Sequence, residues 1–193
     1  IKLEKRSDGS IFLSQKGLID KILKATELED CKPNILPASA PLGSDPDGPP
    51  MSEKWSYSSV IGMLLYLSTN TRCDIAFAVS QVARFSSNPK QSHATAVKSI
   101  IRYLKRTKDQ GMILHPSGQL DLDLYVDADF CGLFRHEDDA VVDSARSRTG
   151  YVIMLSGFPL IWKSQLQSSI SCSTLEAEYT ALSYALKALL PIK

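Results

Sequence analysis

The chain has 193 residues, of which 44% are hydrophobic and 22% are charged, and its formal net charge is +1. This composition is ordinary for a globular protein with one large domain or two small ones. No apolar run approaches the roughly 20 residues that a membrane-spanning helix needs, so we expect no membrane partner. Four scattered cysteines without a C-x-x-C pair argue against a zinc site and for reduced thiols in an intracellular compartment.

The charges are unevenly distributed along the chain. Residues 72–108 contain eight Lys or Arg and a single acid, whereas residues 121–143 contain eight Asp or Glu and a single base. A basic module followed by an acidic one suits a protein that binds a polyanion and holds cations nearby.

The first fifty residues begin with two strand-like runs, residues 1–6 and 11–14, around the turn signal Ser-Asp-Gly-Ser. Apolar residues at helical spacing then predict a helix around residues 18–23. Residues 31–50, called the strap below, hold six of the ten prolines. This excludes a helix or a central strand, so we expect an extended connection over the surface.

Three helices are predicted next, over residues 55–68, 74–85 and 92–108. The third helix has one apolar stripe, formed by Ala94, Val97, Ile101 and Leu104. A second face carries four bases, Lys98, Arg102, Lys105 and Arg106. Such a face is most often a solvated surface. The local lack of acids favours the alternative, a surface that contacts a nucleic-acid phosphate backbone.

The final third of the chain reads as a sheet followed by a helix. Strands are predicted over residues 111–114, 120–127, 149–155 and 159–167, the last two joined by a tight hairpin. A helix follows over residues 174–190. We expect its core side to carry Leu175, Tyr179, Leu182, Leu186 and Leu189. Helices followed by a sheet with a packed helix make an α/β fold, α+β overall.

Carboxylates at two places are the candidates for chemistry. In the strand 120–127 the leucines point to one face and Asp127 to the other, near the strand's end, although Asp often merely ends a strand. In the last helix, Ser173-x-x-Glu176 is a capping box, which explains Glu176 but not Glu178. Hard divalent cations prefer carboxylate oxygens, and two such ions about 4 Å apart can promote phosphodiester hydrolysis. The sequence has no Gly-rich phosphate loop or nucleophile-elbow motif, and its three histidines are isolated.

Three segments of the sequence resemble a known family. Residues 57–112, which begin YSSVIGMLLYLSTN, closely resemble the region of copia-type LTR retrotransposon polyproteins between the reverse transcriptase palm and ribonuclease H. Residues 1–23 are similar to the start of the thumb of that family. Residues 124–132 (LYVDADFCG) and 147–183, with the motif STLEAEY, resemble the first half of its ribonuclease H domain.

The resemblance implies hydrolysis of the RNA strand of RNA–DNA hybrids during reverse transcription, with two Mg²⁺ ions. It places the family's first catalytic and metal-binding aspartate on Asp127 and its catalytic, metal-binding helix glutamate on Glu178, with Asp129 in a supporting role. The later metal-binding acids and the polymerase aspartates of the family are missing from this sequence, and the insert 133–146 is longer than in many relatives. We therefore expect weak or no hydrolysis by the chain itself, so its status as an enzyme stays open.

The expected organisation is a reverse transcriptase thumb or connection region over residues 1–118 and a truncated ribonuclease H-like domain over residues 119–193. The expected partners are an RNA–DNA hybrid or other nucleic acid and the remainder of the Pol polyprotein, in a cytoplasmic particle, the nucleus or both. The alternative is a degenerate or domesticated relic that only binds nucleic acid or protein. A continuing reading frame with two further acids would favour the enzyme, and an early stop the relic.

Overall fold

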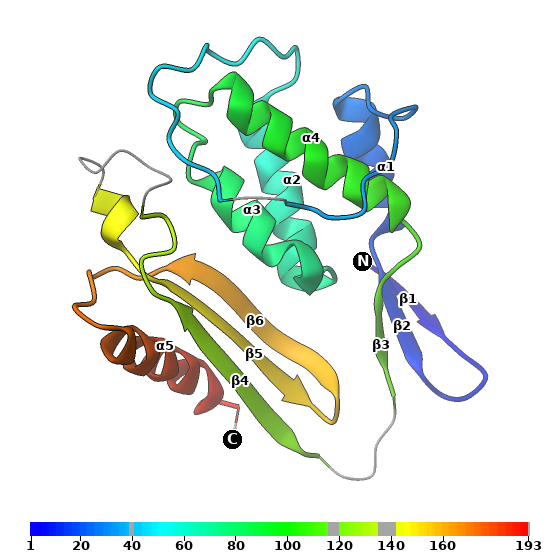
Figure 1. Ribbon diagram of the computed structural model, residues 1–193. Helices are drawn as coiled ribbons and strands as arrows, with labels where there is room; N and C mark the ends of the chain where they lie inside the picture. Colours follow the sequence, from blue (N-terminus) through cyan, green and yellow to red (C-terminus); the bar gives the residue numbers. More distant parts are fainter. Residues whose placement is uncertain (39–40, 116–119, 135–141, 193) are drawn as a thin grey trace. The chain divides into compact units, whose positions relative to one another are not determined.

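The computed structural model describes residues 1–38, 41–115, 120–134 and 142–192 (Figure 1). The chain forms two compact units, residues 1–114 (unit 1) and 115–193 (unit 2). The boundary between them lies four residues before the one expected after residue 118. The predicted mixed fold is confirmed, with helices and two small antiparallel sheets. Within the described residues, no helix has the length and apolar character needed to cross a membrane.

Unit 1 has a three-stranded antiparallel sheet in the order β1-β2-β3. It consists of β1 (Lys2–Lys5), β2 (Ile11–Ser14) and β3 (Met112–Leu114). The turn between β1 and β2 contains Gly9 with φ +83°, a conformation that glycine adopts without strain. Because β3 pairs with β2, the last residues of unit 1 close onto its first hairpin.

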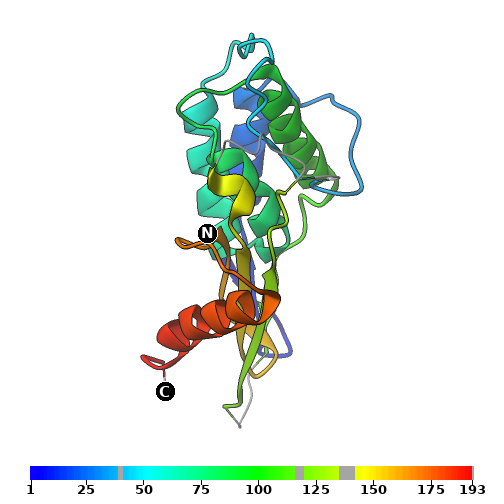
Figure 2. The ribbon, with the colours of Figure 1, turned by 60° about the vertical axis from the view of Figure 1, so that its left-hand side comes forward.

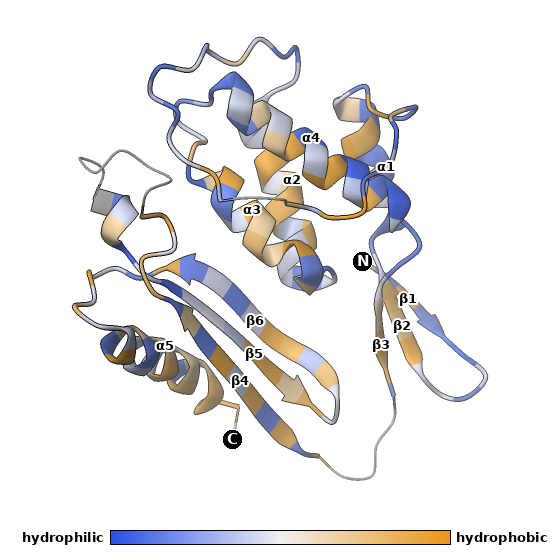
Figure 3. Ribbon diagram, viewed as in Figure 1, coloured by the Kyte–Doolittle hydropathy of each residue, from blue (hydrophilic) through white to orange (hydrophobic). Residues whose placement is uncertain are grey.

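The rest of unit 1 is helical. It contains α1 (Lys16–Ala25), α2 (Tyr57–Asn70), the 3₁₀ turn η1 (Cys73–Ile75), α3 (Ala76–Ala83) and α4 (Gln91–Arg106). Hydrophobic and hydrophilic residues alternate around α4 (Figure 3), and its predicted apolar stripe is confirmed as buried. The largest fully buried side chains of the core come from these elements: Ile19, Ile22, Leu64, Leu67, Ile75, Ile100, Ile101 and Leu104.

Unit 2 has a second antiparallel sheet, in the order β4-β5-β6. Its strands are β4 (Leu122–Asp129), β5 (Arg148–Leu155) and β6 (Phe158–Leu166), with a 3₁₀ turn η2 (Val142–Ala145) before β5. The β5–β6 turn at residues 156–157 has φ values of +48° and +80°, as a two-residue type I′ hairpin requires. The insert predicted over residues 133–146 lies partly outside the described residues.

Helix α5 (Thr174–Leu189) lies along one side of this sheet, against β4 and β5 (Figure 2). The prediction of its core side was wrong. Four of the five residues named for it are exposed: Leu175, Tyr179, Leu182 and Leu186. The stripe that packs on the sheet is Ala177, Ala181 and Ala185, all 0% exposed. Small side chains let the helix approach the sheet closely, and residues of β4, β5 and β6 pack around Ala185. Of the predicted residues, Leu189 alone packs against this core.

Candidate functional site

Asp127 lies on β4, two residues before the end of the strand. Its neighbours Leu124 and Val126 pack into the core of unit 2 together with Ala185 of α5. Because strand side chains alternate between faces, Asp127 projects from the face opposite α5, and its side chain is exposed. This confirms the prediction that Asp127 lies on the face away from the leucines.

The turn after β4 is built around Asp129. A Cβ atom on Gly132 would lie only 1.8 Å from Asp129 Oδ2, so glycine is the residue that fits there. Between them Cys131 adopts φ +51°, and its backbone N–H donates to Ser147 Oγ at 3.4 Å. The Asp129 carboxylate is therefore folded over its own turn, next to the strand end that carries Asp127. The supporting role expected of Asp129 stays a prediction.

The two glutamates at the start of α5 have different surroundings. Ser173 caps the helix, because its Oγ accepts a hydrogen bond from the Glu176 backbone N–H at 3.1 Å. The Glu176 carboxylate accepts one from the Cys172 backbone N–H at 2.7 Å. The capping interpretation of Glu176 is thus confirmed, and the backbone N–H that its carboxylate accepts from belongs to Cys172, the residue before the N-cap Ser173. Glu178, in contrast, is exposed, and its side chain has no hydrogen bond or ion pair with any residue that the structure describes.

Asp127 and Glu178 come from two elements that touch, β4 and α5, but the strand turns Asp127 to the sheet face that α5 does not cover. Among the described residues, no three His, Cys, Asp or Glu side chains lie close enough together to hold a metal ion. The carboxylate oxygens are the ligand type that Mg²⁺ prefers. The kind of ligand therefore fits magnesium, whereas the number gathered here does not complete a two-metal site. The pairing of Asp127 with Glu178 stays a prediction.

Three of the four bases predicted to bind nucleic acid contact the connection between α1 and α2. Lys98 Nζ forms an ion pair of 2.5 Å with Glu53, whose pKa it holds below the usual value through this hydrogen bond. Arg102 Nε donates to the Lys32 carbonyl at 2.6 Å, and Lys105 Nζ donates to the Cys31 carbonyl at 2.8 Å. Arg106 is exposed, and its side chain makes no such contact within the described chain.

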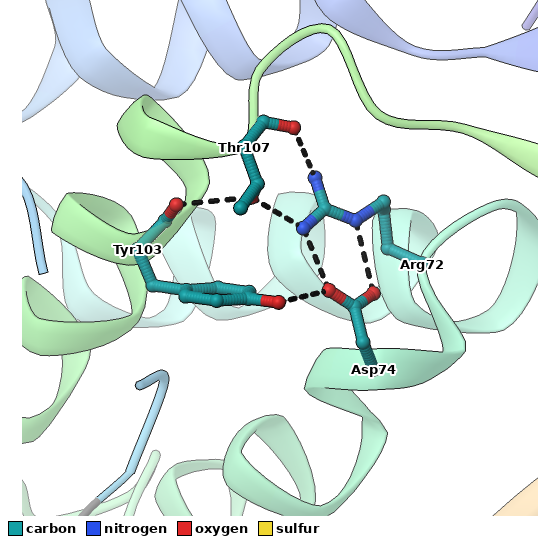
Figure 4. Close-up of polar contacts among 4 residues, drawn as sticks. All are labelled: Arg72, Asp74, Tyr103 and Thr107. Carbon is teal, nitrogen blue, oxygen red and sulfur yellow. Dashed lines mark hydrogen bonds and ion pairs between the residues drawn. The ribbon is translucent and has the colours of Figure 1, made fainter. Parts of the chain in front are cut away.

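A polar network that was not predicted surrounds Arg72, which is 3% exposed (Figure 4). Arg72 Nε and Nη2 donate to the Asp74 carboxylate at 2.9 and 2.7 Å. Its Nη1 and Nη2 donate to the Thr107 carbonyl and hydroxyl at 3.0 and 2.6 Å, and Tyr103 Oη donates to Asp74 at 2.7 Å. The network fixes the end of α4 against the α2–η1 junction. An Arg-x-Asp pair between two apolar helices was the available signal.

Burial and hydrogen bonding act in opposite directions on Asp74. Burial alone would raise the pKa of this carboxyl, because it disfavours the charged form. The hydrogen bonds from Arg72 and Tyr103 outweigh burial and hold the pKa of Asp74 below its usual value. Asp74 therefore stays ionised at neutral pH, as a partner for the buried guanidinium.

The chain is similar to retrovirus-related Pol polyproteins. It is 34% identical over 186 residues to that of transposon TNT 1-94 from Nicotiana tabacum, which covers 93% of this chain and 13% of the relative. It is 34% identical over 179 residues to that of transposon RE1 from Arabidopsis thaliana, covering 92% and 12%. An uncharacterized mitochondrial protein of Arabidopsis thaliana is 30% identical over 178 residues, covering 92% of this chain and 70% of the relative.

No family model and no solved structure matches the chain. The similarity to the transposon proteins nonetheless extends over more than nine-tenths of its length, although the chain spans only 12% to 13% of theirs. The chain therefore belongs to the retrovirus-related Pol polyproteins of copia-type retrotransposons, of which it represents one segment.

Proposed function

We propose that unit 2 is part of a ribonuclease H-like domain that hydrolyses the RNA strand of RNA–DNA hybrids. Unit 1 would belong to the reverse transcriptase region of the same polyprotein. The observation that carries the proposal is the contrast between the two helix glutamates. The Glu176 carboxylate caps the helix through its hydrogen bond with the Cys172 backbone N–H. Glu178, in contrast, is exposed on a helix that packs against β4, the strand that carries Asp127.

In this proposal Asp127 and Glu178 are metal ligands. Two Mg²⁺ ions, when bound, supply activation of the attacking water and stabilisation of the leaving oxygen. The chain's own contribution is to present the ligands. The paired strand β4 holds Asp127, the Asp129–Gly132 turn keeps the adjoining loop close, and the Ser173–Glu176 cap stabilises the first turn of the helix that carries Glu178.

A two-metal site needs several carboxylates from separate elements, and the described residues offer no group of three. We therefore assign the activity to a longer Pol protein that contains this segment. The 193-residue chain by itself is expected to cleave hybrids weakly or not at all. Robust Mg²⁺-dependent cleavage by the chain alone, abolished by Asp127→Asn, would contradict this assignment.

The test is hybrid cleavage by the longer Pol protein. Asp127→Asn and Glu178→Gln should each lower the rate by more than about a hundredfold. This exceeds the usual effect of mutating residues that only hydrogen-bond to metal ligands. Asp123→Asn, on the same strand face as Asp127, and Glu176→Gln, in the same helix as Glu178, are the matched controls and should retain the rate. Full activity of Asp127→Asn would contradict the proposal.

A second candidate function is binding without catalysis, as in a degenerate or domesticated copy of the element. Two observations favour it: the described residues gather no metal-binding group, and one relative is a protein of which the chain spans 70%. Hybrid binding by the longer protein, with no cleavage at any Mg²⁺ concentration, would select this function over the first.

A further inference from the structure

The described residues of the strap, 31–38 and 41–50, include contacts with α4 at both ends, and residues 43–49 are held firmly. His93 is 0% exposed, and its Nε2 lies 3.0 Å from the Gly43 carbonyl. Lys90 Nζ donates to the carbonyls of Pro46 and Gly48 at 3.2 and 3.1 Å, and the Gln91 backbone N–H donates to the Pro49 carbonyl at 3.0 Å. A hydrogen-bonded buried ring and several backbone contacts therefore hold residues 43–49 against the start of α4.

The first residues of the strap, 31–36, are held more weakly. The hydrogen bonds that join them to α4 are those from Lys105 and Arg102 to the carbonyls of residues 31 and 32, and one from the Asn34 backbone N–H to the Arg102 carbonyl at 3.2 Å. None of the six side chains is buried, and Ile35 and Leu36 are 73% and 60% exposed. Burial of apolar side chains therefore contributes little to holding residues 31–36 on α4.

The partners of the α4 bases also differ in charge. Lys98 faces a carboxylate, Glu53, so the charge of that pair is balanced. Arg102 and Lys105 donate to neutral carbonyls, which satisfy their hydrogen bonds but leave both positive charges uncompensated. A hydrogen bond from a cationic side chain to a neutral carbonyl gains from the charge of the donor alone, whereas a bond to an anionic oxygen also gains from the attraction between two full charges. Anionic phosphate oxygens are therefore stronger acceptors for these two side chains than the strap carbonyls.

The nearest acids along the chain do not change this balance. Glu29 and Asp30 directly precede residue 31, but neither forms an ion pair with Arg102 or Lys105 in the described part of the chain. Arg106 is exposed beside them on the last turn of α4. Displacement of residues 31–36 would present three uncompensated positive charges on adjacent turns of one helix.

We propose that residues 31–36 are a displaceable cover over a phosphate-binding surface made of Arg102, Lys105 and Arg106. A nucleic-acid backbone takes the place of the two strap carbonyls, while Lys98 serves as a structural ion pair and does not contact phosphate. This inference rests on the nucleic-acid binding expected of α4 and adds to it the identity of the contacting residues and the segment that competes with the ligand.

The first arm of the test identifies the surface. Binding of a fluorescent RNA–DNA hybrid to the full chain is measured against salt concentration. The triple variant Arg102→Ala, Lys105→Ala, Arg106→Ala should reduce the slope of log K against log salt by about 2 to 3, because each lost phosphate contact removes about 0.9. Lys98→Ala is the matched control and should leave the slope unchanged.

The second arm identifies the cover. Asn34→Pro removes the backbone N–H that holds the strap to the Arg102 carbonyl, whereas Asn34→Ala keeps it. Asn34→Pro should bind the hybrid about threefold to tenfold more tightly, the effect of one net hydrogen bond, and Asn34→Ala should bind like the wild type. As a direct readout, Cys31 as the sole thiol (Cys73, Cys131 and Cys172 replaced by Ser) should react faster with a maleimide when the hybrid is added.

The outcomes separate the two claims. If the triple variant loses slope but Asn34→Pro binds no more tightly and Cys31 reactivity does not rise, the surface stands and the cover is overturned. If the triple variant keeps the wild-type slope, or the chain does not bind the hybrid at all, the nucleic-acid role of α4 fails and the inference fails with it. A flattened slope in Lys98→Ala would contradict the assignment of Lys98 as a structural residue.

Discussion

The two units place their charged and apolar side chains differently. Unit 1 buries a continuous aliphatic core, and its deeply buried guanidinium of Arg72 has donors bonded to Asp74 and Thr107. Unit 2 has a core of few buried side chains and leaves carboxylates of β4 and leucines of α5 exposed. Exposed carboxylates and apolar side chains are available to ligands and partners, whereas buried groups that are already hydrogen-bonded within the protein are not. We therefore expect stability to be concentrated in unit 1 and metal chemistry in unit 2.

The largest effect is expected at Arg72. Arg72→Ala leaves the Asp74 carboxylate and the Thr107 carbonyl without their guanidinium partner. Breaking a buried ion pair in this way costs about 3 to 5 kcal/mol, and the lower end applies because the Asp74 side chain is 34% exposed. The measurement is urea unfolding followed by Trp55 fluorescence in a Trp162→Phe background, which reports on unit 1 alone.

Tyr103→Phe is the milder companion to this variant. It removes a single hydrogen bond to Asp74 and should lower the free energy of unfolding by about 1 kcal/mol. Equal losses in Arg72→Ala and Tyr103→Phe would show that the network is not organised around the guanidinium.

A second prediction concerns the face of α5 that packs on the sheet. Ala181→Leu introduces a large side chain where the residue is 0% exposed and should lower the free energy of unfolding of unit 2 by about 2 kcal/mol. Leu175→Ala, at a side chain that is 63% exposed, should change it by less than about 0.5 kcal/mol. Trp162 fluorescence in a Trp55→Phe background measures both, and a larger loss in Leu175→Ala would restore the leucine face as the core side.

These two helices show how far the sequence determines the fold. In α4 one stripe is apolar and the opposite face is charged, so periodicity identified the buried side. In α5 both an alanine stripe and a leucine stripe are apolar, and hydropathy ranks leucine higher. Close approach of the helix to the sheet selects alanine, and that depends on tertiary packing that a single sequence does not display.

The candidate site divides in the same way. The Ser173–Glu176 cap is a local pattern over four residues, so it was predictable, and it singled out Glu178. The contacts of Lys105 with residue 31 and of Arg102 with residue 32 join positions about seventy residues apart. No periodicity relates such positions, and for this reason the sequence did not predict that strap carbonyls accept from the bases of α4.

The last prediction is a pH dependence confined to unit 1. Burial lowers the pKa of His93 below its ordinary value, against opposing contributions from the Gly43 carbonyl and Asp45 and with Lys90 and Arg84 nearby. Its Nδ1 accepts a hydrogen bond from the Lys90 backbone N–H at 2.9 Å, so the ring is neutral in the folded state. Protonation would remove this acceptor.

The sign of the pH effect follows from this geometry. Because the folded pKa is depressed, the unfolded chain binds a proton first as the pH falls. The contribution of the neutral His93 ring to the free energy of unfolding is fully present above the pKa of the unfolded chain, about 6.5. It declines below that pH, by at most about 1.4 kcal/mol per pH unit. Urea midpoints of unit 1 between pH 7 and 5 should show this decline, and His93→Gln should flatten it. The exposed His115→Gln serves as the control, and an equal flattening there would assign the effect elsewhere.

The central claim, that Asp127 and Glu178 share a metal site, is tested most directly by adding Mn²⁺ to the ¹⁵N-labelled chain and recording amide line broadening. Mn²⁺ accepts the same carboxylate ligands as Mg²⁺. The amide signals around Asp127 and Glu178 should broaden at the same low Mn²⁺ concentration, and Asp127→Asn should abolish the broadening at Glu178. Broadening at Glu178 that persists in Asp127→Asn would show that the two carboxylates do not act on one ion.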